Sequence, residues 1–142
     1  MHEKMLITIK KFLIEEIDPE FVMLFGSYAT GQTHFKSDVD VAFYKEAHDL
    51  SAYEVLMLAQ ELAGLIKMGV DLVDLRVAST VFKMQIFGKG INIYVKDEHL
   101  FNKYEMTVYR MYADLNEKRR EVLTEIHESG TIYGTRLRCS EK

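Results

Sequence analysis

The chain has 142 residues, the size of one ordinary domain, and 48% of them are hydrophobic, which is enough to build a core. It carries 22 acidic against 18 basic residues, and this net charge of −4 disfavours a general nucleic-acid-binding surface. The single cysteine, Cys139, excludes an internal disulfide, and no apolar run is long enough to span a membrane. We therefore expect a cytoplasmic protein without a signal peptide.

Apolar periodicity predicts helices and strands that alternate along the chain. A first helix, with apolar residues from Met5 to Ile17, should end at Pro19. The predicted strands are 21–25, 38–44, 70–77 and 90–95. Ser51 and Glu54 have the spacing of a capping box and should open a helix that stops near Gly69, and further helices should follow Ser79 and span about 100–127. This alternation predicts a single α/β (α+β) domain over residues 1–128 and a mobile tail over 129–142.

Asp38 and Asp40 stand one residue apart in the apolar segment DVDVAFY. Residues two apart in a strand point to the same face, so both carboxylates should project together. Burying two like charges is costly unless a cation compensates them, and carboxylate oxygens suit Mg²⁺, which also binds phosphate oxygens. The alternative is a pair of aspartates on an edge strand that faces water.

The Gly26-Ser27 pair ends the apolar run FVMLF that precedes these aspartates. At a strand-to-helix turn of this kind, backbone N–H groups and the serine hydroxyl can bind a phosphate, and a glycine lets the backbone approach it. Taken alone, the pair also fits an ordinary turn. The combination G-S-x10-D-x-D is much rarer by chance than either half, which favours a phosphate and metal site.

The segment VDLVDL offers a third carboxylate, from Asp71 or Asp74. These residues are three apart, so they should point to opposite faces of a regular strand, and only one can join Asp38 and Asp40. The spacing alone leaves the choice open. It also leaves open that each aspartate simply begins or ends a strand.

The segment GSYATGQTHFKSDVD resembles the signature of nucleotidyltransferases of the DNA polymerase β superfamily. The short length and the segments VDLVDLRVAS and FGKGINIY resemble the minimal nucleotidyltransferases called MNT domains. The likeness covers about residues 20–96 and implies a mixed sheet of about four strands, flanked by helices, with a long C-terminal helix. Many relatives carry arginines just after Gly-Ser, where this chain has Tyr28 and Thr30.

The resemblance also implies an activity and a role for each residue. A nucleoside triphosphate, with ATP expected, would transfer its monophosphate to a hydroxyl while Gly26 and Ser27 hold its phosphates. Asp38 and Asp40 would bind two Mg²⁺ ions with the nucleotide, and the third carboxylate would join them at the second ion. Matching GVDLV to the family's later strand favours Asp71 over Asp74 and makes Asp71 the residue that helps to deprotonate the acceptor.

Stand-alone MNT proteins resemble antitoxins that pair with a helical HEPN ribonuclease and can transfer AMP to a toxin tyrosine. We therefore expect a HEPN-type toxin as partner, no membrane, and no stable nucleic-acid partner; homo-oligomerisation stays open. Two alternatives remain. The chain could modify a small hydroxylated molecule, as antibiotic-modifying relatives do, or neutralise its partner by binding alone.

The C-terminal helical pattern carries an apolar stripe that includes Phe101, Tyr104 and Val108. The stripe could pack on the chain's own core or on a partner, since Met and Tyr are enriched at interfaces. Tyr109 lies outside the stripe, so we expect its ring to be exposed and to help dock the partner.

Overall fold

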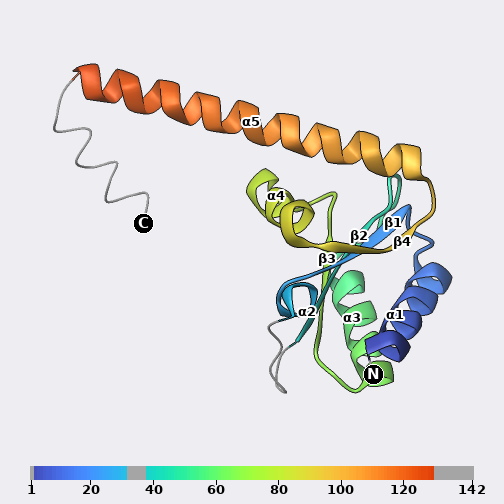
Figure 1. The fold of residues 1–142 in the computed structure, drawn as a ribbon. Helices are drawn as coiled ribbons and strands as arrows, with labels where there is room; N and C mark the ends of the chain where they lie inside the picture. The colour runs from blue at the N-terminus through green and yellow to red at the C-terminus, as the bar shows by residue number, and fades with distance from the viewer. Residues whose placement is uncertain (1, 32–37, 130–142) are drawn as a thin grey trace.

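The computed structural model describes residues 2–31 and 38–129 (Figure 1). The tail expected over residues 129–142 lies outside this part of the chain except for Ser129, which is the last residue of helix α5, and residues 32–37 of the Gly-Ser/Asp-x-Asp segment also lie outside it. The described residues form nine elements in the order α1 (His2–Glu16), β1 (Phe21–Phe25), α2 (Ser27–Thr30), β2 (Val39–Tyr44), α3 (Ala52–Ile66), β3 (Val70–Asp74), α4 (Thr80–Lys89), β4 (Ile91–Val95) and α5 (Glu98–Ser129).

The four strands form one mixed sheet in the order β3-β2-β1-β4. β1 pairs antiparallel with both β2 and β4, whereas β2 and β3 run parallel. The parallel pair needs a crossover connection, and α3 supplies it. The mixed four-stranded sheet with flanking helices and a long C-terminal helix is thus confirmed.

Helices cover both faces of the sheet (Figure 1). Alternate residues of each strand point to opposite faces and enter two separate core clusters. The first cluster joins the sheet to α1 and α3 through residues such as Ile9, Leu62 and Val41. The second joins it to α4 and α5 through residues such as Ala42, Ile86 and Val108. A side chain on β2 or β3 therefore belongs to one cluster or the other according to its position.

Local sequence signals set most ends of the helices and strands, but α3 and β3 end earlier than expected. Ser51 and Glu54 form the predicted capping box, and Ser79 accepts the N–H of Phe82 at 3.1 Å. α3 ends at Ile66 with Lys67 in the left-handed conformation, before the expected stop at Gly69. β3 ends at Asp74 rather than at residue 77, because the chain turns there: the N–H of Val77 donates to the carbonyl of Asp74 at 3.2 Å.

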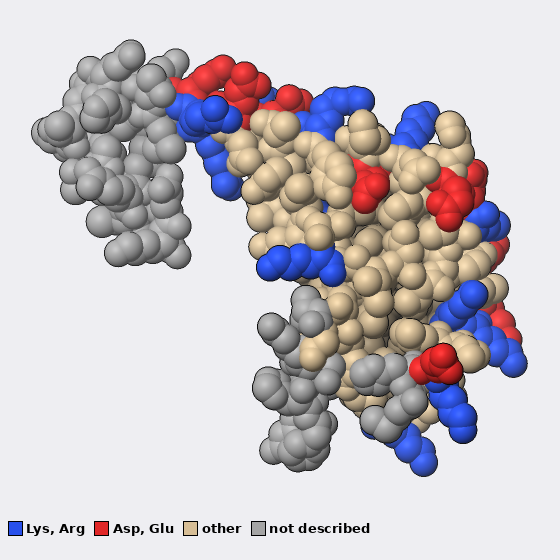
Figure 2. Space-filling view, in the orientation of Figure 1, with Lys and Arg blue, Asp and Glu red and all other residues tan. Residues whose placement is uncertain are grey.

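Charged side chains are spread around the face that Figure 2 shows, and its described residues form no concentrated patch of Lys and Arg. Within residues 2–31 and 38–129, no helix combines the length and hydropathy needed to cross a bilayer.

The expectation of an exposed Tyr109 is wrong. Its ring is partly buried and packs against the second core cluster, and its hydroxyl donates to the Glu105 carboxylate at 3.3 Å. Over residues 98–121 of α5, whose side chains the structure describes, the exposed large apolar side chains are instead Met106 and Met111, at 61% and 44% of full exposure. The helical periodicity placed Tyr109 outside the main stripe, but α4 packs on α5 and widens the buried face.

Tyr109→Ala should therefore lower the free energy of unfolding, by about 1–3 kcal/mol, because it removes a ring packed on the core. Thermal unfolding followed by circular dichroism tests this result. Met106→Ala is the matched control on the same helix and should leave the melting temperature unchanged. Equal melting temperatures for both variants would place the Tyr109 ring outside the core.

Candidate active site

Asp40 lies in the middle of the sheet, on β2 between β1 and β3. The strand register places it beside Phe25, the last residue of β1, and beside Asp71 on β3. Residues in register on neighbouring strands share a face, so Asp40 and Asp71 project together. Two residues further on, Ala42 and Val73 pack in the second core cluster, so both carboxylates lie on the face that α4 and α5 cover.

Two glycines lie directly against the aspartates. A Cβ atom on Gly26 would overlap the Oδ2 atom of Asp40, and one on Gly69 would overlap the Oδ1 atom of Asp38. The Asp40 side chain therefore packs against Gly26, the residue after β1. The side chain of Asp38, which directly precedes β2, packs against Gly69, the residue before β3. Gly26 also has a φ of +72°, a conformation that side-chain-bearing residues rarely adopt.

Gly69 is a site residue that the sequence reasoning missed, because a glycine after a helical pattern was taken only as a stop signal. Lys67, two residues before Gly69, already ends α3, so Gly69 is not needed for that purpose. The usable signal was its place directly before the strand that carries Asp71. A glycine there lets the Asp38 carboxylate pass close to the backbone.

The three carboxylates form one electrostatic cluster. Partial burial raises the pKa of Asp40 above its ordinary value, and the negative charges of Asp71 and then Asp38 raise it further. In the protein without ligands, the negative charges of Asp71 and Asp38 therefore destabilise the ionised form of Asp40. A bound cation would relieve this repulsion.

The Gly-Ser turn connects β1 to the short helix α2 as the sequence predicts. The N–H of Ala29 donates to the carbonyl of Gly26 at 3.1 Å, and Gly31 ends the helix with a φ of +77°. Since Gly26 touches Asp40, the turn places Ser27 next to the carboxylate cluster. Tyr28, which stands where many relatives have arginine, packs against the first core cluster, and its hydroxyl donates to the Met68 sulfur at 3.7 Å.

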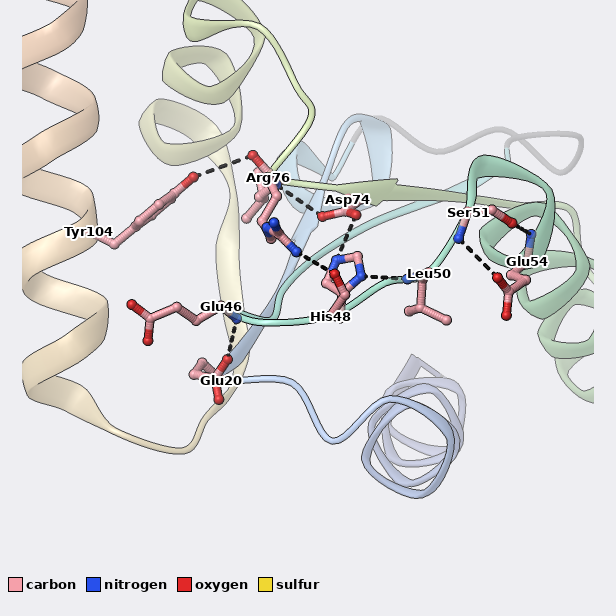
Figure 3. A network of polar contacts seen from close by, with 10 residues as sticks. Glu20, Glu46, His48, Leu50, Ser51, Glu54, Asp74, Arg76 and Tyr104 are labelled. Atoms are coloured by element: carbon pink, nitrogen blue, oxygen red, sulfur yellow. Dashed lines mark hydrogen bonds and ion pairs between the residues drawn. The ribbon is translucent and has the colours of Figure 1, made fainter.

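Asp74 belongs to the network of polar contacts that Figure 3 shows. It is 7% exposed, whereas Asp71 is exposed. Its Oδ2 atom lies 2.9 Å from Nε2 of the buried His48, and its Oδ1 atom accepts the N–H of Arg76 at 3.0 Å. His48 Nδ1 accepts the N–H of Leu50 at 2.9 Å, so the ring proton lies on Nε2, the nitrogen next to the Asp74 carboxylate.

The Arg76 guanidinium completes this network by donating to the His48 carbonyl at 2.7 Å. These bonds join the loop between β2 and α3 to the end of β3 (Figure 3). Asp74 thus has partners that hold the fold together. The geometry places Asp71, and not Asp74, in register with Asp40 on one face.

The donor chemistry of the cluster fits Mg²⁺. Among the described His, Cys, Asp and Glu side chains, no group of three forms a closed site that could hold an ion by itself. Mg²⁺ typically takes one or two protein carboxylates together with substrate phosphates and water. Asp38 and Asp40, with Asp71 as neighbour, suit an ion that arrives with a nucleotide.

Comparison with known proteins agrees with this geometry. Residues 8–99 match the model of the family described as polymerase beta, nucleotidyltransferase. The chain belongs to this nucleotidyltransferase family. The family inferred from the Gly-Ser/Asp-x-Asp signature is thus confirmed. A relative, protein adenylyltransferase MntA of Shewanella oneidensis, is 35% identical over 109 residues, which are 75% of this chain and 76% of the relative.

Two solved structures are similar along most of the chain. One is a toxin–antitoxin crystal structure with AMP-PNP; it is 32% identical, has a TM-score of 0.77, and covers 84% of this chain and 96% of its own. The other contains a tri-AMPylated HEPN toxin of Shewanella oneidensis in complex with an MNT antitoxin. It is 29% identical, has a TM-score of 0.74, and covers 88% of this chain and 98% of its own.

Proposed function

We propose that this nucleotidyltransferase is the antitoxin of a HEPN toxin and transfers AMP from ATP to a hydroxyl of that toxin. The observation that carries the proposal is the placement of Asp38, Asp40 and Asp71 in one cluster beside the Gly26-Ser27 turn. The likeness to MntA and to an MNT antitoxin bound to AMPylated toxin supports a protein acceptor over a small molecule. The AMP-PNP in a similar structure supports ATP as the donor.

In this reaction the acceptor oxygen forms a bond to the α-phosphorus of ATP. The bond from that phosphorus to the bridging oxygen breaks, and pyrophosphate leaves with the electron pair. Asp71 takes the acceptor proton, while Gly26 and Ser27 bind the departing phosphates. Asp38 and Asp40 would hold the Mg²⁺ ions, with Asp71 as a further ligand of the second. When bound, Mg²⁺ supplies positive charge at the attacking and leaving oxygens.

The remaining assignments follow from this activity. We place the whole catalytic unit within residues 1–128, which contain the site and both core clusters. A cytoplasmic location follows from ATP as the substrate and agrees with a single cysteine in the chain.

Gly26→Ala should abolish most of the transfer, because its Cβ would displace the Asp40 carboxylate and its backbone would be strained at a φ of +72°. Gly64→Ala is the matched control, since an added Cβ there meets nothing within 4 Å. Steady-state transfer rates and melting temperatures of both variants test this. Wild-type transfer by Gly26→Ala would show that the Gly-Ser turn does not set the position of Asp40.

The proposed activity is tested by incubating the protein with Mg²⁺, labelled ATP and a purified HEPN toxin. Label in the α-phosphate should move to the toxin, whereas label in the γ-phosphate should appear only in pyrophosphate. Label transferred from the γ-phosphate would indicate a kinase. If neither label moves but the toxin is still inhibited, the chain neutralises its partner by binding alone.

A further inference from the structure

A groove of about 550 Å³ runs along the outer edge of β3, a volume within the range of ligand sites. It wraps around this edge strand, because its lining comes from helices on both faces of the sheet. Its lining includes Leu56 and Ala59 of α3, Asp71 and Val73 of β3, and Val77 and Phe82 on the α4 side. The groove therefore contains the proposed catalytic carboxylate.

The backbone of β3 is available for pairing on this side. In the sheet of the described residues β3 has only β2 as a neighbour. Val39 donates its N–H to the carbonyl of Gly69 at 2.8 Å, and Leu75 donates to that of Phe43 at 3.0 Å. Backbone N–H and C=O groups of successive residues point to alternate sides of a strand. Since Gly69 and Leu75 bond to β2, the N–H and C=O groups of Val70 and Leu72 point toward the open edge.

Apolar side chains flank this edge on both faces. Leu56 is 53% exposed on one side, and Val77 is 81% exposed on the other. Next to them, Phe82 packs edge-on against Phe25, with ring centroids 5.6 Å apart, and so forms a fixed wall beside the carboxylate cluster. Exposed apolar residues that line a groove are typical of a binding surface.

We propose that this groove binds the extended segment of the toxin that carries the acceptor hydroxyl, as an added strand on β3. The proposal rests on the proposed function, because it uses Asp71 as the group that takes the acceptor proton. A base must lie within hydrogen-bonding reach of that proton, so the acceptor has to enter where Asp71 lies. The groove continues from Asp71 along β3 and past its end at Asp74 to Val77.

The added strand would pair its backbone with Val70 and Leu72 and direct alternate side chains to the two faces. Apolar side chains on one face would contact Leu56. The hydroxyl residue would lie on the other face, beside Asp71. Its oxygen would bond to the α-phosphorus as pyrophosphate leaves, and its proton would pass to Asp71.

Leu56→Asp and Val77→Asp test the groove, since both side chains are exposed and neither touches the metal or the nucleotide in this account. Each should raise the KM for the toxin roughly tenfold or more and leave AMP-PNP binding unchanged. Ile7→Asp, at a site 64% exposed on α1, is the matched control and should behave as wild type. Melting temperatures establish that each variant is folded.

Hydrogen exchange supplies a readout that does not depend on turnover. The toxin, added with AMP-PNP, should slow exchange of the amides in residues 70–74 of the full chain. If both groove variants have the wild-type KM and the toxin does not protect the amides of residues 70–74, the proposed groove is wrong. The proposed function would still hold in that case if the wild-type protein transfers AMP to the toxin. Protection without transfer would retain the groove as the docking site and refute the proposed chemistry.

Two other occupants give different results. Protection of residues 70–74 that rises with protein concentration without toxin, together with a dimer in native mass spectrometry, would assign the edge to a second copy. Protection without toxin that disappears on deletion of residues 130–142 would assign it to that segment. Either result would overturn the proposal.

Discussion

Asp38→Asn and Asp40→Asn should each lower the rate of AMP transfer by about 10²- to 10³-fold or more, because each removes a carboxylate that we propose as a Mg²⁺ ligand, with a loss of several kcal/mol in the transition state. The loss should appear in kcat measured at saturating Mg²⁺ and ATP. Asp114→Asn, an exposed aspartate on α5, is the matched control and should keep wild-type activity. Wild-type turnover in either site variant would remove that residue from the site.

The same Asp40→Asn substitution should leave the melting temperature unchanged or raise it. The folded protein raises the pKa of Asp40 above its ordinary value of 3.8, so the native state binds the proton more tightly than the unfolded chain does. Stability therefore falls as the pH rises from that ordinary value through the folded pKa, and the penalty persists at neutral pH. Asparagine carries no charge and removes the penalty. A lower melting temperature at pH 7 would contradict this account of the cluster.

Asp71→Ala and Asp74→Ala should have opposite effects. Asp71→Ala should abolish transfer with little change in stability, since Asp71 is exposed and adds to the repulsion on Asp40. Asp74→Ala should lower the free energy of unfolding by about 2–3 kcal/mol, because it leaves His48 and the Arg76 N–H without their buried partner.

Thermal unfolding and transfer assays on both aspartate variants provide the check. At a temperature well below the unfolding transition of Asp74→Ala, this variant is folded and its transfer rate should be close to that of the wild type. Loss of transfer only in Asp74→Ala, with both variants equally stable, would reverse the assignment of the third carboxylate.

The sequence carried enough information to predict the sheet and the position of β2, because Asp38 and Asp40 interrupt an apolar run at strand spacing. It also predicted that Asp71 and Asp74 would face opposite sides of β3. It could not show which one would join Asp40, since that depends on the register between β2 and β3, a contact between segments about 30 residues apart. The contact of Asp74 with His48, which lies in the loop after β2, likewise depends on the tertiary structure.

Other features depended on packing that a single helix pattern does not contain. Tyr109 became partly buried because α4 lies on α5 beside the main stripe. Gly69 became a contact of Asp38 because β3 runs parallel to β2 and begins beside it. The groove along β3 depends on which strand is at the edge of the sheet, and strand order is not visible in the alternation of apolar residues.

The central claim is that a carboxylate cluster on the sheet transfers AMP to a toxin, and the intact mass of the toxin tests it most directly. After incubation with wild-type protein, Mg²⁺ and ATP, the mass of the HEPN toxin should rise by one or more whole AMP groups. With Asp40→Asn it should not change, although the two proteins still form a complex. An unchanged toxin mass with the wild-type protein, in a mixture where the toxin is fully neutralised, would contradict the account.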